Sequence, residues 1–362
     1  MKKGQRIFVT DCEGPISKND NAFELMSRIV PNGDRIFSLI SRYDDVLADV
    51  VKKRGYKAGD TLRLILPFMR AYGATNEMFR DYSSRNVLLV SGADETLRSV
   101  NALMPSFIVS TSYEQYIFSL CDVTGFPKEN VYCTRLDIDK YGLPEAEITK
   151  IKSITEELST KQMIEIPDAA ASVKELPQKS QETVARLDEI FWRELPGMRA
   201  GIMMNDVNPV GGFEKANAVK DIAKKTGADL SSIIYVGDSI TDVDPFRLVR
   251  SAGGLAVSFN GNRYAVRETE IAVMSHHTCI TTVMAEVFNR FGKQKLLDLA
   301  DEWSLNNVEP FCNPPLFKKL EGVVAQKPVR VEKITKSNME KLASESSAFR
   351  KTVRGEAVGK LG

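Results

Sequence analysis

The sequence has very little histidine, and its cysteines do not occur in pairs. Only His276 and His277 are present in 362 residues, and none of the five scattered cysteines belongs to a Cys-x-x-Cys motif. An odd number of scattered cysteines argues against a disulfide framework and a zinc site, and favours the reducing cytoplasm. A serine hydrolase with a Ser-His-Asp triad would have to use one of the two histidines as its base.

Features typical of membrane and nucleic-acid-binding proteins are also missing. No apolar run reaches 18 residues and no signal-peptide core follows the first three residues, so we expect a protein that is not integral to a membrane. Lys and Arg number 49 against 48 Asp and Glu, so the net charge gives no case for a nucleic-acid partner. A length of 362 residues suits one large domain with insertions, or two domains.

Hydrophobic periodicity predicts that short strands alternate with helices. Apolar runs typical of strands occur at 5–10, 107–109, 233–236 and 254–259, with apolar residues at helical spacing between them. The segment 86–92, NVLLVSG, has the composition of a strand or of a strand-like entry. The pattern therefore predicts an α/β protein with a Rossmann-like parallel sheet core.

Two blocks of the chain show only helical stripes and predict insertions into this core. From Phe317 onward the chain holds 11 Lys and Arg against 5 Asp and Glu, which predicts a solvated, partly frayed tail or a docking surface for an acidic partner. We expect a core at 1–16, 86–144 and 200–285, a helical cap at 17–85, a second helical insertion at 145–199, and a helical basic C-terminal tail at 286–362.

Polar residues follow the ends of the predicted strands or begin the helices after them. Because the carboxyl ends of parallel strands converge on one crevice, these side chains are expected to meet there. The candidates are Asp11, Glu13, Ser110, Thr111, Lys215, Asp238 and Asp242.

Each type of residue suits one task in phosphoryl transfer. The Asp11 carboxylate can take the phosphoryl group as an aspartyl phosphate, and Glu13 can protonate the leaving oxygen and later deprotonate water. Ser110 and the Thr111 amide can donate hydrogen bonds to phosphate oxygens. Lys215 can neutralise charge on the nucleophile and on the transferring group.

The same residues predict a Mg²⁺ site, because this ion prefers oxygen ligands and keeps several waters. Asp11, the Glu13 carbonyl and Asp238 would supply three ligands. Asp242 is a fourth candidate, for which orienting the other groups fits better than binding the ion directly.

The segment 233–242, IIYVGDSITD, fits two different enzymes. Gly-Asp-Ser followed by Ile opens the nucleophile block of GDSL-type esterases, whereas a strand followed by Gly-Asp-x-x-x-Asp is typical of metal-dependent phosphohydrolases. Those esterases place their histidine in an Asp-x-x-His block, but Val273 and Met274 stand three residues before the two histidines here. This favours Asp238 over Ser239 as the residue that carries the chemistry.

Four segments resemble the four ordered motifs of the haloacid dehalogenase-like hydrolase superfamily. They are DCEGP at 11–15, FIVSTSYEQY at 107–116, FEKANAV at 213–219 and VGDSITD at 236–242. The segment 258–273 is similar to phosphoserine-phosphatase-like members. The layout also resembles an archaeal branch known as subunit R of an energy-converting hydrogenase.

The sequence departs from the usual motifs of this superfamily at three positions. Glu13 stands where Asp is usual, Pro15 where Thr is common, and Thr241 where Asn is frequent. The resemblance implies a Mg²⁺-dependent phosphatase acting on a small phosphomonoester through an aspartyl phosphate. The alternatives are a phosphotransferase of the same mechanism, or a non-catalytic accessory subunit of a larger, hydrogenase-type complex joined through the C-terminal tail.

Overall fold

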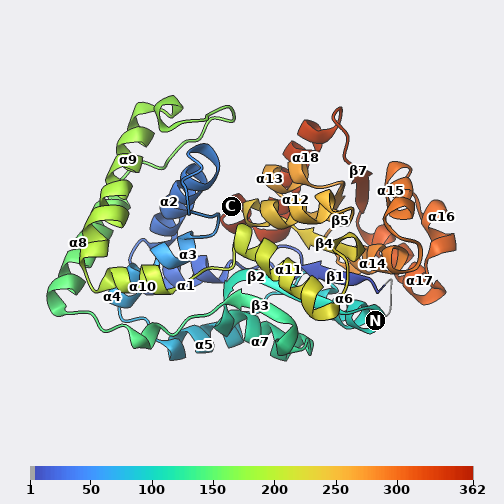
Figure 1. The fold of residues 1–362 in the computed structure, drawn as a ribbon, viewed down its shortest axis with the longest axis horizontal. Coiled ribbons are helices and arrows are strands. Elements are labelled where there is room, and N and C mark those ends of the chain that lie inside the picture. The colour runs from blue at the N-terminus through green and yellow to red at the C-terminus, as the bar shows by residue number, and fades with distance from the viewer. Residues whose placement is uncertain (1–4, 362) are drawn as a thin grey trace.

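The computed structural model describes residues 5–361, which fold around one seven-stranded sheet (Figure 1). The strand order is β3-β2-β1-β4-β5-β6-β7, in which only β7 is antiparallel to its neighbour. The predicted fold class, an α/β protein with a Rossmann-like parallel core, is confirmed. The strands are β1 (Ile7–Thr10), β2 (Ser106–Tyr113), β3 (Val131–Thr134), β4 (Ile233–Gly237), β5 (Leu255–Phe259), β6 (Ile271–Met274) and β7 (Arg330–Lys333).

Helices cover both faces of the sheet, which is why its central strands are apolar throughout. In β1, Phe8 packs toward one face, against α6 (Ala93–Leu103), α7 (Glu114–Thr124) and α14 (Cys279–Phe291). Its neighbours Ile7 and Val9 pack toward the other face, against α11 (Phe213–Thr226) and α12 (Val243–Ser251). All four β1 residues are buried, so the carboxyl end of this strand is fixed in position.

The two helical insertions pack together into one cap unit beside the sheet (Figure 1). Its hydrophobic cluster joins residues 22–79 to residues 136–207. The cap helices are α1 (Asn21–Ile29), α2 (Gly33–Asp45), α3 (Thr61–Leu64), α4 (Leu66–Ala71), α5 (Asn76–Arg85), α8 (Glu145–Thr160), α9 (Gln178–Glu189) and α10 (Ala200–Asp206), with π-helical turns at Val46–Val50 and Ile190–Glu194.

Two local expectations differ from the structure. Residues 200–206 were expected to begin the core, but they form α10, whose Met203 and Met204 pack in the cap cluster. The segment 86–92 was expected to be a strand or a strand-like entry, and it forms only isolated bridges, from Leu89 to Ser17 and from Ser91 to His277. Apolar composition alone does not distinguish a strand from an apolar segment that packs without a full ladder.

The expectation of a solvated, frayed C-terminal tail is wrong. After α15 (Lys293–Asp301) and α16 (Leu305–Val308), the chain from Phe317 onward forms most of α17 (Pro314–Gln326), then β7 and α18 (Met339–Arg354). Strand β7 pairs with β6, and α18 packs on β6 and on α13 (Arg263–Glu268) through the fully buried Leu342. Docking of an acidic partner on this segment stays a prediction.

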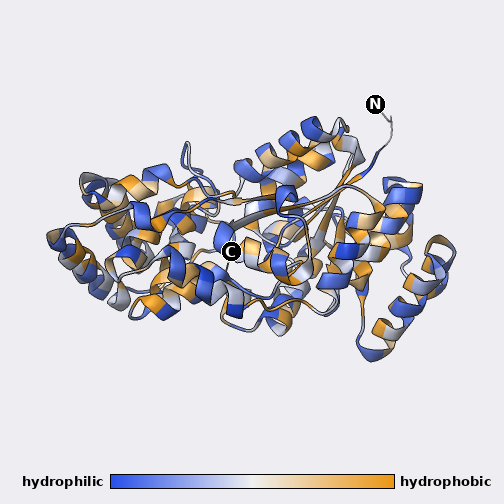
Figure 2. Ribbon diagram, turned by 90° about the horizontal axis from the view of Figure 1, so that it is seen from below, coloured by the Kyte–Doolittle hydropathy of each residue, from blue (hydrophilic) through white to orange (hydrophobic). Residues whose placement is uncertain are grey.

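The last described residues return to the junction between cap and core (Figures 1 and 2). Leu361 packs against the cap cluster. Figure 2 shows helices that carry both hydrophilic and hydrophobic residues, as expected for helices with one buried face. Within residues 5–361, no helix combines the length and the apolar character needed to cross a bilayer.

Candidate active site

A cavity of about 90 Å³ lies where the carboxyl ends of the strands meet the cap. The core contributes the residues after β1, the end of β2 and the loop after β4. The cap covers the cavity with Asp20, just before α1, and with residues of α2, of α3 and of the loop between them, and the C-terminal helix α18 supplies a further wall. The polar lining residues are Asp11, Glu13, Asp20, Ser41, Asp44, Asp45, Thr61, Ser110, Thr111, Ser112, Asp238, Ser239, Thr241, Arg350 and Arg354.

Asp11 is buried directly after β1, and protein groups hold both of its carboxylate oxygens. Its backbone N–H donates to the carbonyl of Val236 at 2.8 Å, which continues the β1–β4 pairing. Oδ1 accepts the Cys12 N–H at 2.6 Å, and Oδ2 lies 2.6 Å from the ammonium of Lys215. Burial raises the pKa of Asp11 to about 7, although Lys215 acts to lower it.

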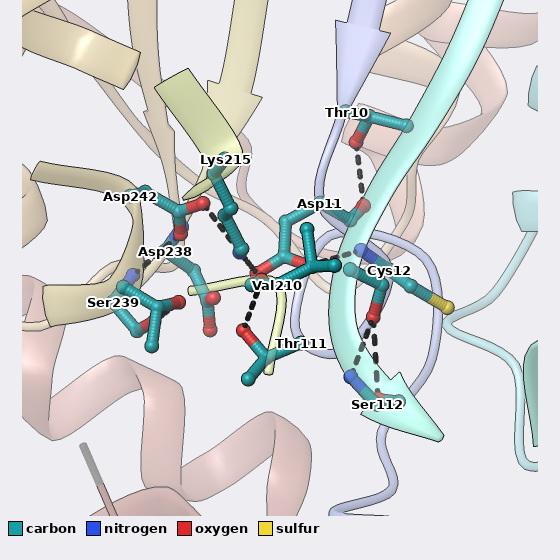
Figure 3. Close-up of polar contacts among 12 residues, drawn as sticks. Thr10, Asp11, Cys12, Thr111, Ser112, Val210, Lys215, Asp238, Ser239 and Asp242 are labelled. Carbon is teal, nitrogen blue, oxygen red and sulfur yellow. Dashed lines mark hydrogen bonds and ion pairs between the residues drawn. The ribbon is translucent and has the colours of Figure 1, made fainter. Parts of the chain in front are cut away.

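Lys215 is fully buried in the first turn of α11, between two carboxylates (Figure 3). Its Nζ lies 2.6 Å from Asp11 and 2.7 Å from Asp242. Burial acts to lower the pKa of Lys215, but the two carboxylates outweigh it and the pKa is raised. The side chain therefore keeps its positive charge beside the candidate nucleophile.

Asp242 uses both carboxylate oxygens to hold protein donors. Oδ1 accepts from Lys215 at 2.7 Å and from the Tyr235 hydroxyl at 2.8 Å, while Oδ2 accepts the N–H groups of Asp238 at 3.0 Å and Ser239 at 3.1 Å. A side chain at Gly237 would bring its Cβ within 2.5 Å of this carboxyl group. Asp242 is thus placed to orient Lys215 and the loop after β4.

Ser239 caps the short helical turn that follows β4, and its surroundings do not suit an esterase nucleophile. It forms a capping box with Asp242, and its hydroxyl lies 3.0 Å from that of Thr241. The ring of His277 accepts the Cys279 N–H at the start of α14, and His276 packs against Phe349. In the described part of the chain, neither histidine lies in the cavity that Ser239 lines.

Asp238 is buried at the end of β4 and has one oxygen available for a ligand. Oδ2 pairs with Arg350 and lies 3.5 Å from Arg354, whereas Oδ1 accepts no hydrogen bond from any residue in 5–361. Burial raises the pKa of Asp238, although the two arginines act to lower it.

The carboxylates of Asp11, Asp238 and Asp242 offer oxygens within 4.8 Å of one another. An unpartnered, buried carboxylate oxygen beside another carboxylate is a donor set that suits Mg²⁺. The residues that are present therefore fit the ion, with Asp238, which has the unpartnered oxygen, as the carboxylate best placed to hold it.

The Glu13 side chain is directed toward the cap. Its carboxylate accepts the N–H of Asn21, the first residue of α1, at 2.8 Å. Burial raises the pKa of Glu13 well above its usual range, Asp20 adds to this effect, and Arg354 opposes it. A raised pKa favours the protonated form of the carboxyl group, which is the form that a general acid requires.

Ser110 and Thr111 lie in the cavity wall at the end of β2. The Ser110 hydroxyl accepts the N–H of Ser112 at 3.2 Å, and that of Thr111 donates to the Val210 carbonyl at 3.0 Å. Helix α7 begins only at Glu114, so Ser110 does not cap it. Phosphate binding by Ser110 and Thr111 stays a prediction.

The cap side of the cavity carries two adjacent buried acids at the end of α2. Asp44 accepts the Tyr56 hydroxyl at 2.6 Å and the Gly59 N–H at 2.8 Å, whereas Oδ1 of Asp45 has no partner in the described chain. Burial raises the pKa of Asp44 to about 8 and that of Asp45 to about 6. On this side of the cavity, Asp45 is therefore the acid with an unpartnered acceptor.

The sequence analysis missed Arg350 and Arg354, which reach the site from α18. Arg354 donates to the carbonyl groups of Lys18, at 3.2 Å, and Asn19 in the connection to the cap. Only one feature of the sequence could have pointed to Arg350 and Arg354. They are four residues apart on an amphipathic helix, which places both on one helical face.

No protein-family model and no curated protein matches the chain. The solved structure of a gene product from Archaeoglobus fulgidus aligns over 99% of both chains, with a TM-score of 0.81 and 26% identity. That likeness extends over the cap and the C-terminal helices as well as the sheet.

More distant likenesses lead to two phosphoserine phosphatase structures, a phospho-aspartyl intermediate analogue and a substrate-bound complex. Both align over 75% of this chain and 93% of theirs at 13% identity, with TM-scores of 0.41 and 0.42. The site residues, rather than these weak likenesses, carry the functional conclusion. The narrower assignment to a hydrogenase subunit is not supported and stays a prediction.

Proposed function

We propose that the protein is a Mg²⁺-dependent phosphohydrolase of the haloacid dehalogenase-like superfamily that acts on a small phosphomonoester. The observation that carries this proposal is the pairing of a buried carboxylate with a buried ammonium group. Asp11 lies 2.6 Å from Lys215, and Asp238, which has an unpartnered oxygen, belongs to the same cluster. A carboxylate nucleophile, a fixed cation and a free metal ligand are the groups that this chemistry requires.

The first chemical step transfers the phosphoryl group to Asp11. A carboxylate oxygen of Asp11 forms a bond to phosphorus while the bond from phosphorus to the substrate oxygen breaks. Glu13 gives its proton to that leaving oxygen, which departs as an alcohol. Lys215 holds the Asp11 carboxylate in position and offsets the negative charge of the transferring group.

The second step releases phosphate. Glu13, now ionised, takes a proton from water, and the water oxygen bonds to phosphorus as the bond to Asp11 breaks. The cap lies over the cavity, an arrangement that favours a small substrate. Mg²⁺ held by Asp11, Asp238 and the Glu13 carbonyl would supply charge that screens the carboxylate nucleophile from the anionic phosphate.

The test is a panel of small phosphomonoesters assayed with Mg²⁺ and with EDTA. We expect hydrolysis that requires the metal, is lost in Asp11→Asn, and is largely kept in Ser239→Ala. Acid quenching during turnover should leave phosphorylated Asp11, detectable by peptide mass spectrometry. Hydrolysis that survives in Asp11→Asn but is lost in Ser239→Ala would reverse the assignment in favour of an esterase-type serine.

Added alcohol distinguishes a hydrolase from a phosphotransferase, because both would share the phosphorylated aspartate. A hydrolase releases inorganic phosphate in equal amounts with and without the alcohol. Transfer of the phosphoryl group to the alcohol, at the expense of inorganic phosphate, would assign the phosphotransferase instead.

A further inference from the structure

The C-terminal helix places a buried arginine on the candidate metal ligand. Nη1 of Arg350 donates to the Asp238 carbonyl at 3.0 Å and also to its carboxylate Oδ2. Only 3% of the Arg350 side chain and 1% of the Asp238 side chain is exposed to solvent. Arg354, one helical turn later, has a side chain that is 4% exposed and lies 3.5 Å from the same Oδ2.

These arginines are held rigidly at the site. Ser346, one turn before Arg350, donates to the Gly261 carbonyl at 2.7 Å, and Leu342 is fully buried. Arg354 is fixed on its other side by the carbonyl groups of Lys18 and Asn19. The guanidinium of Arg350 therefore has little freedom to leave Asp238.

The carboxylates of the candidate metal cluster already have cations as partners. Lys215 pairs with Asp11 and Asp242, while Arg350 and Arg354 pair with Asp238. A divalent cation entering alone would lie beside these buried cations and compete with them for the same carboxylates, which is unfavourable.

An anionic ligand offsets this added positive charge. A phosphomonoester or inorganic phosphate carries close to two negative charges at neutral pH, which match the two positive charges that the ion brings. The buried Nε of Arg350 has no hydrogen-bond partner in the described chain, so one donor remains for such an anion. Burying a donor without an acceptor is costly, and an anion at this point would satisfy it.

We propose that Arg350, supported by Arg354, acts as a tethered cation that makes Mg²⁺ binding at Asp238 conditional on a phosphate-bearing ligand. This proposal rests on the proposed function, because it concerns the metal of the same site. Arg350 is then a positioning residue that makes the binding of the metal and the binding of the substrate depend on each other. Magnesium and phosphate should then bind cooperatively, each raising the affinity for the other by the same factor.

Calorimetric titration of Mg²⁺ measures this coupling without turnover. For the wild-type protein we expect inorganic phosphate to tighten Mg²⁺ binding by at least about tenfold, within the usual range of coupling between sites. Arg350→Gln should bind Mg²⁺ alone more tightly than the wild type does, and phosphate should then have a smaller effect. In the wild type, Mg²⁺ must tighten phosphate binding by the same factor by which phosphate tightens Mg²⁺ binding.

Two variants serve as controls for charge and geometry. Lys341→Gln removes a positive charge from the same helix at a side chain that is 71% exposed, and should behave like the wild type. Arg350→Lys keeps the charge and should retain the dependence on phosphate. If Arg350→Gln does not fold, as judged by circular dichroism, Arg354→Gln is the substitute. It should also bind Mg²⁺ alone more tightly than the wild type does, by a smaller factor.

The outcomes separate this inference from the proposed function. Equal Mg²⁺ affinity in the wild type and Arg350→Gln, with and without phosphate, would overturn the inference and leave the phosphohydrolase standing. Weaker Mg²⁺ binding in Arg350→Gln would also overturn it, since Arg350 would then be orienting Asp238 for the metal. A wild-type protein that binds no Mg²⁺ under either condition would overturn both.

Discussion

Glu13 is the residue whose surroundings most clearly set its protonation state. It accepts the Asn21 N–H, and burial raises its pKa well above the usual value for a glutamate. A raised pKa favours the protonated carboxyl group that can give its proton to a leaving oxygen, whereas a solvated carboxyl group loses its proton at lower pH. The residue also joins core to cap, because Asn21 begins the first cap helix.

We expect Glu13→Gln to lower turnover of an alkyl phosphate by roughly 10²–10⁴, the usual contribution of a positioned proton-transfer group. The glutamine carbonyl can still accept from Asn21, so the fold should be kept. The loss should shrink for an aryl phosphate, whose leaving group needs less protonation. In the wild type, alkyl phosphate turnover should fall as pH rises through the raised pKa of Glu13.

Steady-state kinetics on matched alkyl and aryl phosphates, from pH 5 to pH 9, would check this prediction. Titration of Mg²⁺ is the control, because the predicted ligand from Glu13 is its backbone carbonyl. Full activity of Glu13→Gln on an alkyl phosphate would show that the proton comes from another group.

The site residues that could be predicted are those that follow strands. Asp11 and Asp238 come directly after apolar runs, so their convergence follows from the geometry of a parallel sheet. Arg350 could not be found in this way, since it lies 112 residues from its partner Asp238 and in no motif. Charged side chains on a helix near the end of a chain are more often exposed to solvent. Only the packing of α18 shows that Arg350 is buried instead.

At the scale of elements, the end of α2 combines two carboxyl groups that burial makes costly to ionise. Asp45 is 1% exposed, its Oδ1 has no partner in the described chain, and its pKa is raised to about 6. Between its unfolded pKa, about 3.9, and about 6, the folded state binds more protons than the unfolded state. Stability therefore falls as pH rises through this window.

We expect Asp45→Asn to be more stable than the wild type at pH 7 and to lose this advantage near pH 4. The reason is that asparagine removes a charge that is buried only in the folded state. Urea unfolding at a series of pH values would measure the difference. Asp34→Asn, at an exposed position in the first turn of the same helix, is the matched control and should follow the wild type. Parallel pH profiles for Asp45→Asn and the wild type would contradict the prediction.

Element boundaries were hardest to predict where tertiary packing decides them. Strand β7 has only four residues, RVEK, with one buried, so its pattern carries little signal. It forms because the edge of β6 offers backbone partners from Ile271 to Met274. Helix α10 joins the cap because Met203 and Met204 meet apolar helices there, which periodicity cannot specify.

At the scale of the whole molecule, the site lies between two separately packed units. The cap has its own hydrophobic cluster, and the faces of the sheet have others. The site draws Asp11, Lys215 and Asp238 from the core, Asp44 and Asp45 from the cap, and Arg350 from the C-terminal helix. Motion of the cap relative to the core would therefore open the cavity without disturbing Asp11 and Lys215.

The separate clusters predict that the cap can be destabilised while the sheet stays folded. Phe191 is fully buried in the cap, stacked on Tyr43 at 5.8 Å and edge-on to Phe68 at 6.1 Å between ring centroids. Phe191→Ala should cost about 3–5 kcal/mol, the usual range for deleting a buried ring. Hydrogen exchange followed by mass spectrometry should then show lost protection in 22–79 and 136–207, with little change in the sheet strands.

The matched variant is Phe246→Ala, which deletes a fully buried ring packed edge-on to Tyr235 beneath the sheet. This variant should lose protection in the sheet strands, with little change in the cap. The reason is that the contacts of Phe246 belong to the core cluster and include the strand that leads to Asp238. If both variants lower protection equally in cap and sheet, the molecule unfolds as one cooperative unit. The cap could then open only together with the core, and entry of a substrate would have to rely on smaller movements of the cavity wall.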